Sequence, residues 1–268
     1  ERAGIKTGDK IITVVGEEFT GETMDKAVKV MKGEPKTKVI LTIMRKLKTG
    51  KDEIMDLEII REIIKIETVE SSIIDDNIGY MHITSFDEQT HGDFVKDLKK
   101  LQKSNVNGLV LDLRNNPGGL LDACADIADE LLGEGVIVYT ETKSGETKYY
   151  NSKKGHTDIP LVLLVNEGSA SASEILAGAI KDYGRGEIIG TQTFGKGIVQ
   201  NIKQLSDGSG INLTISEYFT LKGTTVHKVG VQPDIEVELP EDIEVIGIEN
   251  IKEDRQLQKA LEVLKSKI

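Results

Sequence analysis

Three serines occupy alternate positions in one short stretch, NEGSASASEILAG, at residues 166–178. A serine hydroxyl can attack a carbonyl carbon, but it is almost wholly protonated at neutral pH and needs a neighbouring base. Serine also caps the free backbone N–H groups at the start of a helix. Ser169, Ser171 and Ser173 are therefore candidates for a helix cap, for a nucleophile, or for both.

Histidine is the usual base that activates a serine. None of the four stands in a G-x-S-x-G arrangement with the serines, so a structural or solvated role is favoured for His82, His91, His156 and His227. Lysine also activates serine, provided that burial keeps it uncharged. Lys196 stands between two glycines in GTQTFGKGIVQ, among apolar residues rather than on a charged face. Gln200 would share one side of an extended strand with Lys196 and could orient its amine.

A third stretch, LDLRNNPGGLL at residues 111–121, reads as a buried strand, a tight turn and the start of a helix. Such a turn leaves backbone N–H groups free, and free N–H groups can stabilise the oxyanion of an acyl transfer. Taken alone, the stretch predicts only a turn. Together with the serine and lysine stretches, it indicates hydrolytic chemistry.

A competing interpretation concerns the lysine stretch. GTQTFGKG, residues 190–197, matches the phosphate-binding pattern G-x-x-x-x-G-K, but Gly197 replaces the Ser or Thr that would hold magnesium. A phosphate-binding loop also needs a helix directly after it. The following IVQNIKQL alternates like a strand, so nucleotide binding remains the minor alternative.

The elements that must position these residues alternate along the chain. Strands are expected in NIGYMHITSF, GLVLDL and PLVLLV, and helices in DFVKDLKKLQKSN, LLDACADIADELLG and EDRQLQKALEVLKSKI. This order predicts an α/β fold with a mixed sheet and right-handed crossovers. We expect the last helix to pack on the core by its apolar face.

Composition excludes several classes of function. The chain has 268 residues and a formal net charge of -11, which argues against a nucleic-acid partner. Its one cysteine, Cys124, excludes an internal disulfide and is expected in the core, and no Cys/His cluster suggests zinc. No apolar run could span a bilayer and no signal peptide is visible. The chain starts in what reads as mid-domain, so an export signal could have preceded it.

Two family resemblances follow from the quoted residues. AGIKTGDKIITVVG, with the short helix after it, resembles the C-terminal half of a PDZ domain. LVLDLRNNPGGLL, LVNEGSASASEILAGAIKDYGRGEIIGTQTFGKGIVQ and VGVQPDI resemble the tail-specific, or carboxyl-terminal processing, serine proteases, which place a PDZ domain ahead of a Ser/Lys core. The resemblance implies a partial PDZ domain at 1–46, a connecting extended segment at 47–70, a protease core at 71–240 of crotonase-like fold, and a C-terminal segment at 241–268.

The resemblance also implies roles for single residues. In this family the nucleophile is the middle serine, here Ser171, and the base lies 25 positions later, at Lys196. Gln200 matches the third catalytic residue. The oxyanion would be held by the N–H of Ala172 and by that of Gly118 or Gly119, because Pro117 has none. Ser169 and Ser173 then support the turn.

The family implies an endopeptidase that cleaves proteins near or from their C-termini and needs no cofactor or metal. Its substrates carry an apolar C-terminus that the PDZ domain docks, and an extracytoplasmic location, a homodimer and a regulatory protein partner are further implications. A non-catalytic peptide-binding protein of the same fold is the main alternative. Amidases with a Ser-cisSer-Lys arrangement are disfavoured because their lysine lies upstream of the serine, whereas Lys196 follows it.

Overall fold

The computed structural model describes the whole chain except residues 1–2, 7, 48–49, 65–66, 241–242 and 244, and for residues 22 and 202 it describes the backbone only. The chain divides into two compact units, Glu1–Ile66 and Glu67–Ile268. The fold is of the mixed α/β class that the sequence predicts.

The first unit is an antiparallel sheet with one helix. Its strands lie in the order β2 (Glu17–Glu18), β1 (Lys10–Val14), β3 (Lys38–Lys46) and β4 (Asp52–Ile60), and it also contains η1 (Gly21–Thr23) and α1 (Met24–Met31). Alternate residues of β3 point into a small apolar core that contains Val39, Leu41 and Ile43. The Arg61 guanidinium donates to the carbonyl oxygens of Val30 and Met31 at the end of α1.

The predicted connecting segment at 47–70 is shared between the two units. β4 pairs with β3 along its whole length, so residues 52–60 complete the first sheet rather than leave it. β5 (Val69–Ile74) already belongs to the sheet of the second unit. Residues 48–49 and 65–66 of that segment lie outside the described residues.

The second unit is built on a six-stranded sheet in the order β14 (Ile235–Glu236), β11 (Gly186–Gly190), β10 (Leu161–Val165), β7 (Gly108–Asp112), β6 (Ile78–Ile83) and β5. Only the β5–β6 pair, which η2 (Asp75–Asn77) connects, is antiparallel. Every residue of β7 and β10 is buried, which is why both sequences are nearly continuous apolar runs: a central parallel strand is covered on both faces.

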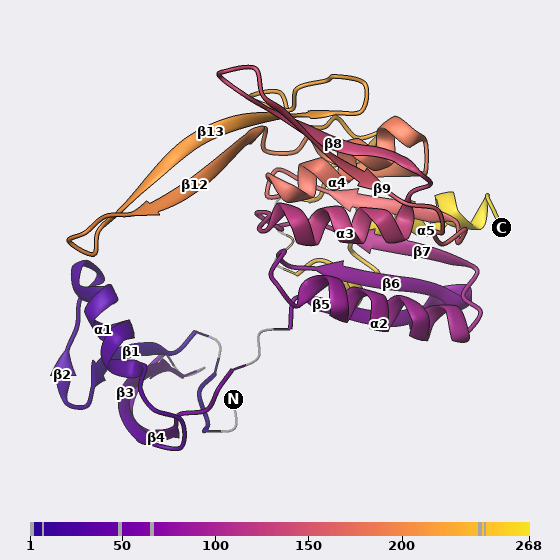
Figure 1. Cartoon of the computed structure of the whole chain (residues 1–268). Coiled ribbons are helices and arrows are strands. Elements are labelled where there is room, and N and C mark those ends of the chain that lie inside the picture. The colour runs from indigo at the N-terminus through magenta and orange to yellow at the C-terminus, as the bar shows by residue number, and fades with distance from the viewer. Residues whose placement is uncertain (1–2, 7, 48–49, 65–66, 241–242, 244) are drawn as a thin grey trace. The chain divides into compact units, whose positions relative to one another are not determined.

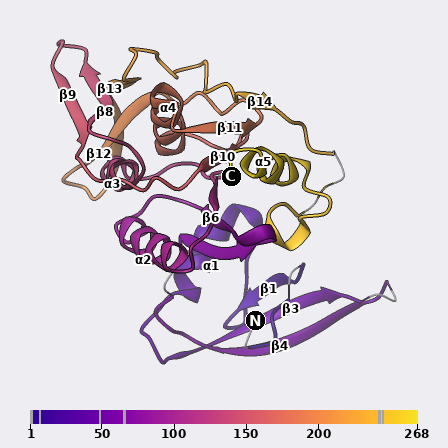
Figure 2. The same ribbon diagram turned by 90° about the vertical axis from the view of Figure 1, so that its right-hand side faces the viewer.

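Helices cover both faces of this sheet (Figure 1). α2 (Thr90–Lys103), α3 (Leu121–Leu131) and α4 (Ala172–Tyr183) share one large apolar core with the sheet. α5 (Arg255–Lys265) follows η3 (Ile248–Asn250) and packs Leu257, Leu261 and Leu264 on the other face (Figure 2). The terminal helix therefore packs on the core as the sequence predicts.

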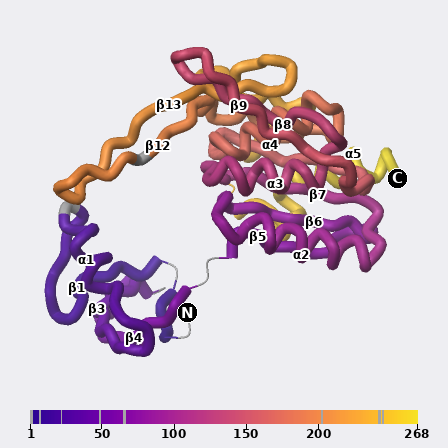
Figure 3. The backbone as a smooth tube through the Cα atoms, viewed as in Figure 1, coloured from indigo at the N-terminus to yellow at the C-terminus, as the bar shows by residue number. Residues whose placement is uncertain are grey.

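A second sheet adjoins the helices. It is antiparallel, in the order β12 (Ile198–Gln204), β13 (Gly210–Thr220), β8 (Gly135–Thr142) and β9 (Thr147–Ser152). Figure 3 traces β12 and β13 as a long hairpin that runs outward from this sheet. Within the described residues, no helix is long and apolar enough to cross a membrane.

A buried ionic cluster anchors α5 to the end of β7. The Arg114 guanidinium, fully buried, contacts the carboxylates of Asp112 at 2.6 Å and Asp254 at 2.8 Å. It also donates to Gln256 Oε1 at 3.0 Å, and the Tyr80 hydroxyl donates to Asp112. Asp254 caps α5 by accepting from the Leu257 N–H. The cluster thus fixes the turn that follows β7.

Replacing Arg114 by methionine would leave the buried carboxylates of Asp112 and Asp254 without their cation. We expect the free energy of unfolding to fall by about 3–5 kcal/mol, measured by urea denaturation followed by circular dichroism. Lys154→Met is the control, since its ion pair with Glu134 joins side chains that are 87% and 62% exposed and should contribute less than about 1 kcal/mol. Equal losses in the two variants would contradict this account.

The cluster also predicts a pH dependence. Burial alone would raise the pKa of Asp254, but the Arg114 guanidinium and the N–H groups of Leu257 and Gly247 outweigh it and lower that pKa. The ionised carboxylate therefore stabilises the fold above its unfolded pKa of about 3.9, and this contribution is lost as the pH falls through the lower folded value. Urea titrations below pH 4 should show a smaller acid-dependent loss for Asp254→Asn than for the wild type. Identical slopes would count against the assignment.

Candidate active site

The serine stretch forms the turn between β10 and α4, as the sequence predicts. Ser171 stands at the N-cap of α4 with φ 55° and ψ -113°. A residue with a side chain rarely adopts this conformation, which costs about 1–3 kcal/mol and must be held by its surroundings. The strained turn presents Ser171 at the positive end of the α4 dipole.

The two flanking serines tie this turn to the turn after β7. Ser169 Oγ donates to the Leu113 carbonyl oxygen at 2.8 Å and accepts from the Asn166 N–H at 3.0 Å. Ser173 Oγ donates to the Asn116 carbonyl oxygen at 2.9 Å. Both side chains are fully buried, so their hydrogen bonds hold the turn rather than face a ligand.

The Asn-Asn-Pro-Gly-Gly turn lies directly against Ser171. A Cβ added to Gly118 would lie 2.8 Å from the Ser171 Cβ and 2.9 Å from the Ala172 nitrogen, so no larger residue fits there. The Gly118 N–H donates to Asn116 Oδ1 at 2.9 Å. Within the part of the chain that the structure describes, the N–H groups of Gly119 and Ala172 donate no hydrogen bond to another protein group.

A single carboxylate joins the serine turn to the lysine loop. Glu174, fully buried in the first turn of α4, accepts hydrogen bonds at Oε2 from the N–H groups of Ser171 (2.9 Å) and Lys196 (2.8 Å). Its Oε1 accepts from Thr193 Oγ1 (2.6 Å) and the Gly195 N–H (2.7 Å). The backbone nitrogens of Ser171 and Lys196 are therefore bound to the same oxygen atom.

The lysine loop, residues 191–197, is also held from its other side. The buried Tyr218 hydroxyl donates to the carbonyl oxygens of Ser171 (3.1 Å) and Lys196. Burial, and then the Glu174 charge, raises the pKa of Tyr218, so the hydroxyl keeps its proton. The VGVQPD stretch contributes Val231, whose N–H donates to Thr193 Oγ1 at 2.7 Å. This hydrogen bond holds the VGVQPD stretch against the lysine loop.

The contacts that link Ser171 to Lys196 involve their main chains. Lys196 is partly buried, and among the described residues no hydrogen bond joins its ammonium to the Ser171 hydroxyl. Gln200 is exposed, and its Oε1 accepts from Asn212 Nδ2 at 3.4 Å. β12 starts only at Ile198, so Lys196 lies before the strand, and the register with β13 shifts between Val199 and Gln200. The alternation of an extended strand therefore does not relate positions 196 and 200.

Two of the four histidines lie beside carboxylates. His91 lies 3.5 Å from Glu130, and His156 lies 3.4 Å from Asp158. Cys124 is fully buried, and burial raises the pKa of its thiol, so it is a core residue as predicted.

The described residues at this place form neither a phosphate-binding loop nor a metal cluster. The lysine loop leads into strand β12 instead of a helix, so it lacks the N-terminal N–H groups that a phosphate-binding loop needs. In the described part of the chain, no three His, Cys, Asp or Glu side chains gather as metal ligands.

Sequence reasoning missed the residues that hold the site together. Glu174 could have been found, because Ser171 and Glu174 form the S-x-x-E pattern of a capping box, although that pattern does not predict the contact with Lys196. Tyr218, Thr193 and Asn116 carry no local signal. As a whole, the arrangement offers a strained serine, a nearby lysine loop and two backbone N–H groups that have no partner among the described residues, and acyl transfer requires such parts.

Comparison with known proteins agrees with this chemistry. Residues 77–237 match the model of peptidase family S41. A carboxy-terminal-processing protease of Bartonella bacilliformis is 41% identical over 246 residues, 89% of this chain and 56% of its own length. A carboxyl-terminal-processing protease of Synechocystis is 38% identical over 271 residues, 98% of this chain and 62% of its own length.

Solved structures agree as well. The photosystem II D1 C-terminal processing protease is 32% identical, with a TM-score of 0.62 over 96% of this chain and 70% of its own. The chain spans less than two thirds of the length of the two curated relatives. Since the family model covers well over half of the chain, the chain belongs to peptidase family S41.

Proposed function

We propose that this chain carries the catalytic core of a serine endopeptidase that cleaves polypeptides near or from their C-termini, with Ser171 as nucleophile and Lys196 as base. The observation that carries the proposal is the Glu174 carboxylate, which binds the backbone of both residues at 2.9 and 2.8 Å. A Ser/Lys dyad made of these two residues would have both of its backbones bound to one side chain. The names of the relatives support the same activity.

In the proposed reaction, neutral Lys196 takes the proton of the Ser171 hydroxyl as Oγ bonds to the scissile carbonyl carbon. The tetrahedral intermediate collapses, the C–N bond breaks, and the lysine returns the proton to the leaving amine. Water, deprotonated by the same lysine, then attacks the acyl-enzyme and releases Ser171. The lysine side chain must turn toward the serine for this sequence.

The proposed oxyanion hole consists of the Ala172 N–H and the Gly119 N–H. Both are without a partner among the described residues, whereas the Gly118 N–H is engaged by Asn116 at 2.9 Å. Gly118 then serves by its small size, since a side chain would collide with Ser171. The Gln200 amide can bind the Lys196 amine only if β12 shifts and the hydrogen bond from Asn212 to Gln200 breaks.

The proposal also covers substrate recognition, assembly and cellular location. The first unit, as a partial PDZ domain, would dock an apolar substrate C-terminus. A homodimer, a regulatory protein partner and an extracytoplasmic location are proposed on the family resemblance alone.

Ser171→Ala and Lys196→Ala test the dyad. Each should lower kcat/KM by about 10⁴-fold or more on an unstructured polypeptide that ends in apolar residues, because nucleophile and base act as one unit. Full cleavage by Lys196→Ala would refute the mechanism. If the wild type binds this polypeptide without cleaving it, a non-catalytic peptide-binding protein becomes the better description.

Glu174→Gln tests the hydrogen bonds that connect the serine turn to the lysine loop. An amide nitrogen would face backbone N–H donors, so the serine turn and the lysine loop should separate. A displacement of about 1 Å lowers rates by about 10²-fold, and we expect a loss of that size in kcat/KM. The exposed Glu146→Gln, which also removes one negative charge, should leave the rate unchanged. The proposed role fails if Glu174→Gln retains wild-type rates.

A further inference from the structure

A pocket of about 320 Å³ lies at the carboxyl ends of β10 and β11, beside the serine turn and on the side of α5. Its volume is at the lower end of the range for small-ligand sites. Carboxyl ends of parallel strands are the usual place for ligands in α/β sheets. None of the proposed catalytic residues is among the described residues that line it, so the pocket is distinct from the proposed catalytic centre.

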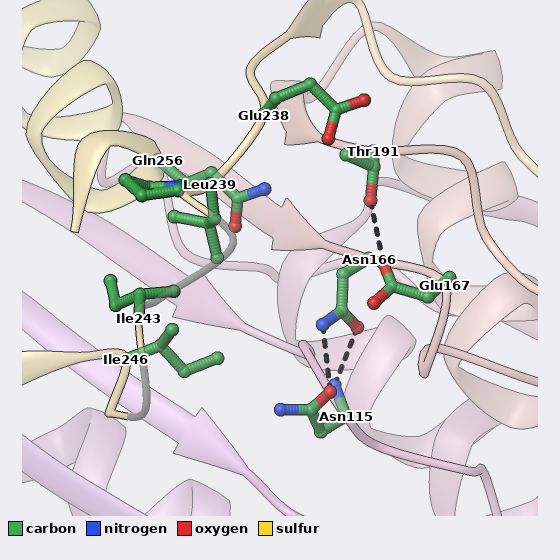
Figure 4. A pocket seen from close by; sticks show the side chains of 10 residues that line it. Asn115, Asn166, Glu167, Thr191, Glu238, Leu239, Ile243, Ile246 and Gln256 are labelled. Carbon is green, nitrogen blue, oxygen red and sulfur yellow. Dashed lines mark hydrogen bonds between the residues drawn. The ribbon is translucent and has the colours of Figure 1, made fainter.

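One wall of this pocket is acidic. Glu167 and Glu238 both line it and are both exposed, and the Thr191 hydroxyl between them donates to Glu167 Oε2 at 3.0 Å (Figure 4). None of the described residues that line the pocket is a lysine or an arginine. Two carboxylates without a cationic neighbour attract a positive ligand group.

The opposite wall is apolar. Leu239, Ile243 and Ile246 extend from the segment between β14 and α5 and are only partly buried (Figure 4). A bare metal ion would gain nothing from these side chains. A ligand that fits both walls combines a cationic head with an aliphatic stem or an apolar neighbour.

We propose that this pocket binds an arginine side chain of a polypeptide. The planar guanidinium offers five donors in a fixed fork that suits carboxylates, and Glu167 and Glu238 supply two of them. Its aliphatic stem, and an apolar residue next to it, would lie on Ile243 and Ile246. A lysine ammonium is a point donor and would engage the two carboxylates less well.

The pocket is joined to the catalytic turn through an asparagine pair at its base. Asn166 Nδ2 donates to Asn115 Oδ1 at 2.8 Å, and Asn166 Oδ1 accepts from the Asn115 N–H at 2.8 Å. The Asn166 N–H in turn donates to Ser169 Oγ. A polypeptide in the pocket would therefore contact residues that also hold the turn of Ser171. Binding itself does not depend on the proposed Ser/Lys chemistry.

The test measures binding without cleavage. Fluorescein-labelled Gly-Ser-Leu-Arg-Leu-Ser-Gly-amide is titrated with the Ser171→Ala protein, and anisotropy gives Kd. The same peptide with citrulline in place of arginine is the neutral probe of equal shape. Glu167→Gln and Glu238→Gln are added to this background, with Glu88→Gln, an exposed residue outside the pocket, as the control of equal charge.

We expect the arginine peptide to bind more tightly than the citrulline peptide. Glu167→Gln and Glu238→Gln should each weaken it about fivefold, as expected for one exposed charge pair, while Glu88→Gln should have no effect. Equal binding of the two peptides would overturn the proposal. So would equal losses in all three glutamate variants, because the attraction would then come from net charge alone.

Discussion

The Glu174 carboxylate is the interaction on which the rest of the site depends. It is fully buried, and each of its oxygens accepts two hydrogen bonds from backbone N–H groups or a hydroxyl. A buried carboxylate is costly unless donors surround it, and here the donors come from the serine turn and the lysine loop alone. Moving either segment would strip the carboxylate of partners. The charge therefore fixes the distance between two segments that the chain itself leaves free.

Two further groups of contacts support the Glu174 hydrogen bonds. The Asn116 backbone and side chain bind the serine turn and the adjacent glycine turn. Arg114, two residues earlier, is locked by Asp112 on one side and by Asp254 at the start of α5 on the other. The C-terminal helix is thus tied to the turn beside the candidate active site by an ion pair between residues far apart in the sequence. The strained backbone conformation of Ser171 persists because these contacts hold the residue in place.

The sequence predicted the local parts of this arrangement well. Continuous apolar runs identified β7 and β10, and the serine stretch identified the strand, turn and helix around Ser171, because those patterns depend on neighbours in the chain. Tyr218 and Asp254 could not be found in this way, because each acts on a segment far from it in sequence. The surroundings of Gln200 could not be found from strand alternation either, because Lys196 precedes β12 and the register shift beside Gln200 is a property of the pairing with β13.

The most direct test of the account is covalent labelling by a biotinylated fluorophosphonate, followed by mass spectrometry of the labelled peptides. The account predicts one adduct, on Ser171, that forms slowly or not at all in Lys196→Ala and in Glu174→Gln. An adduct on Ser169 or Ser173, or labelling of Ser171 that is unaffected by both variants, would contradict it.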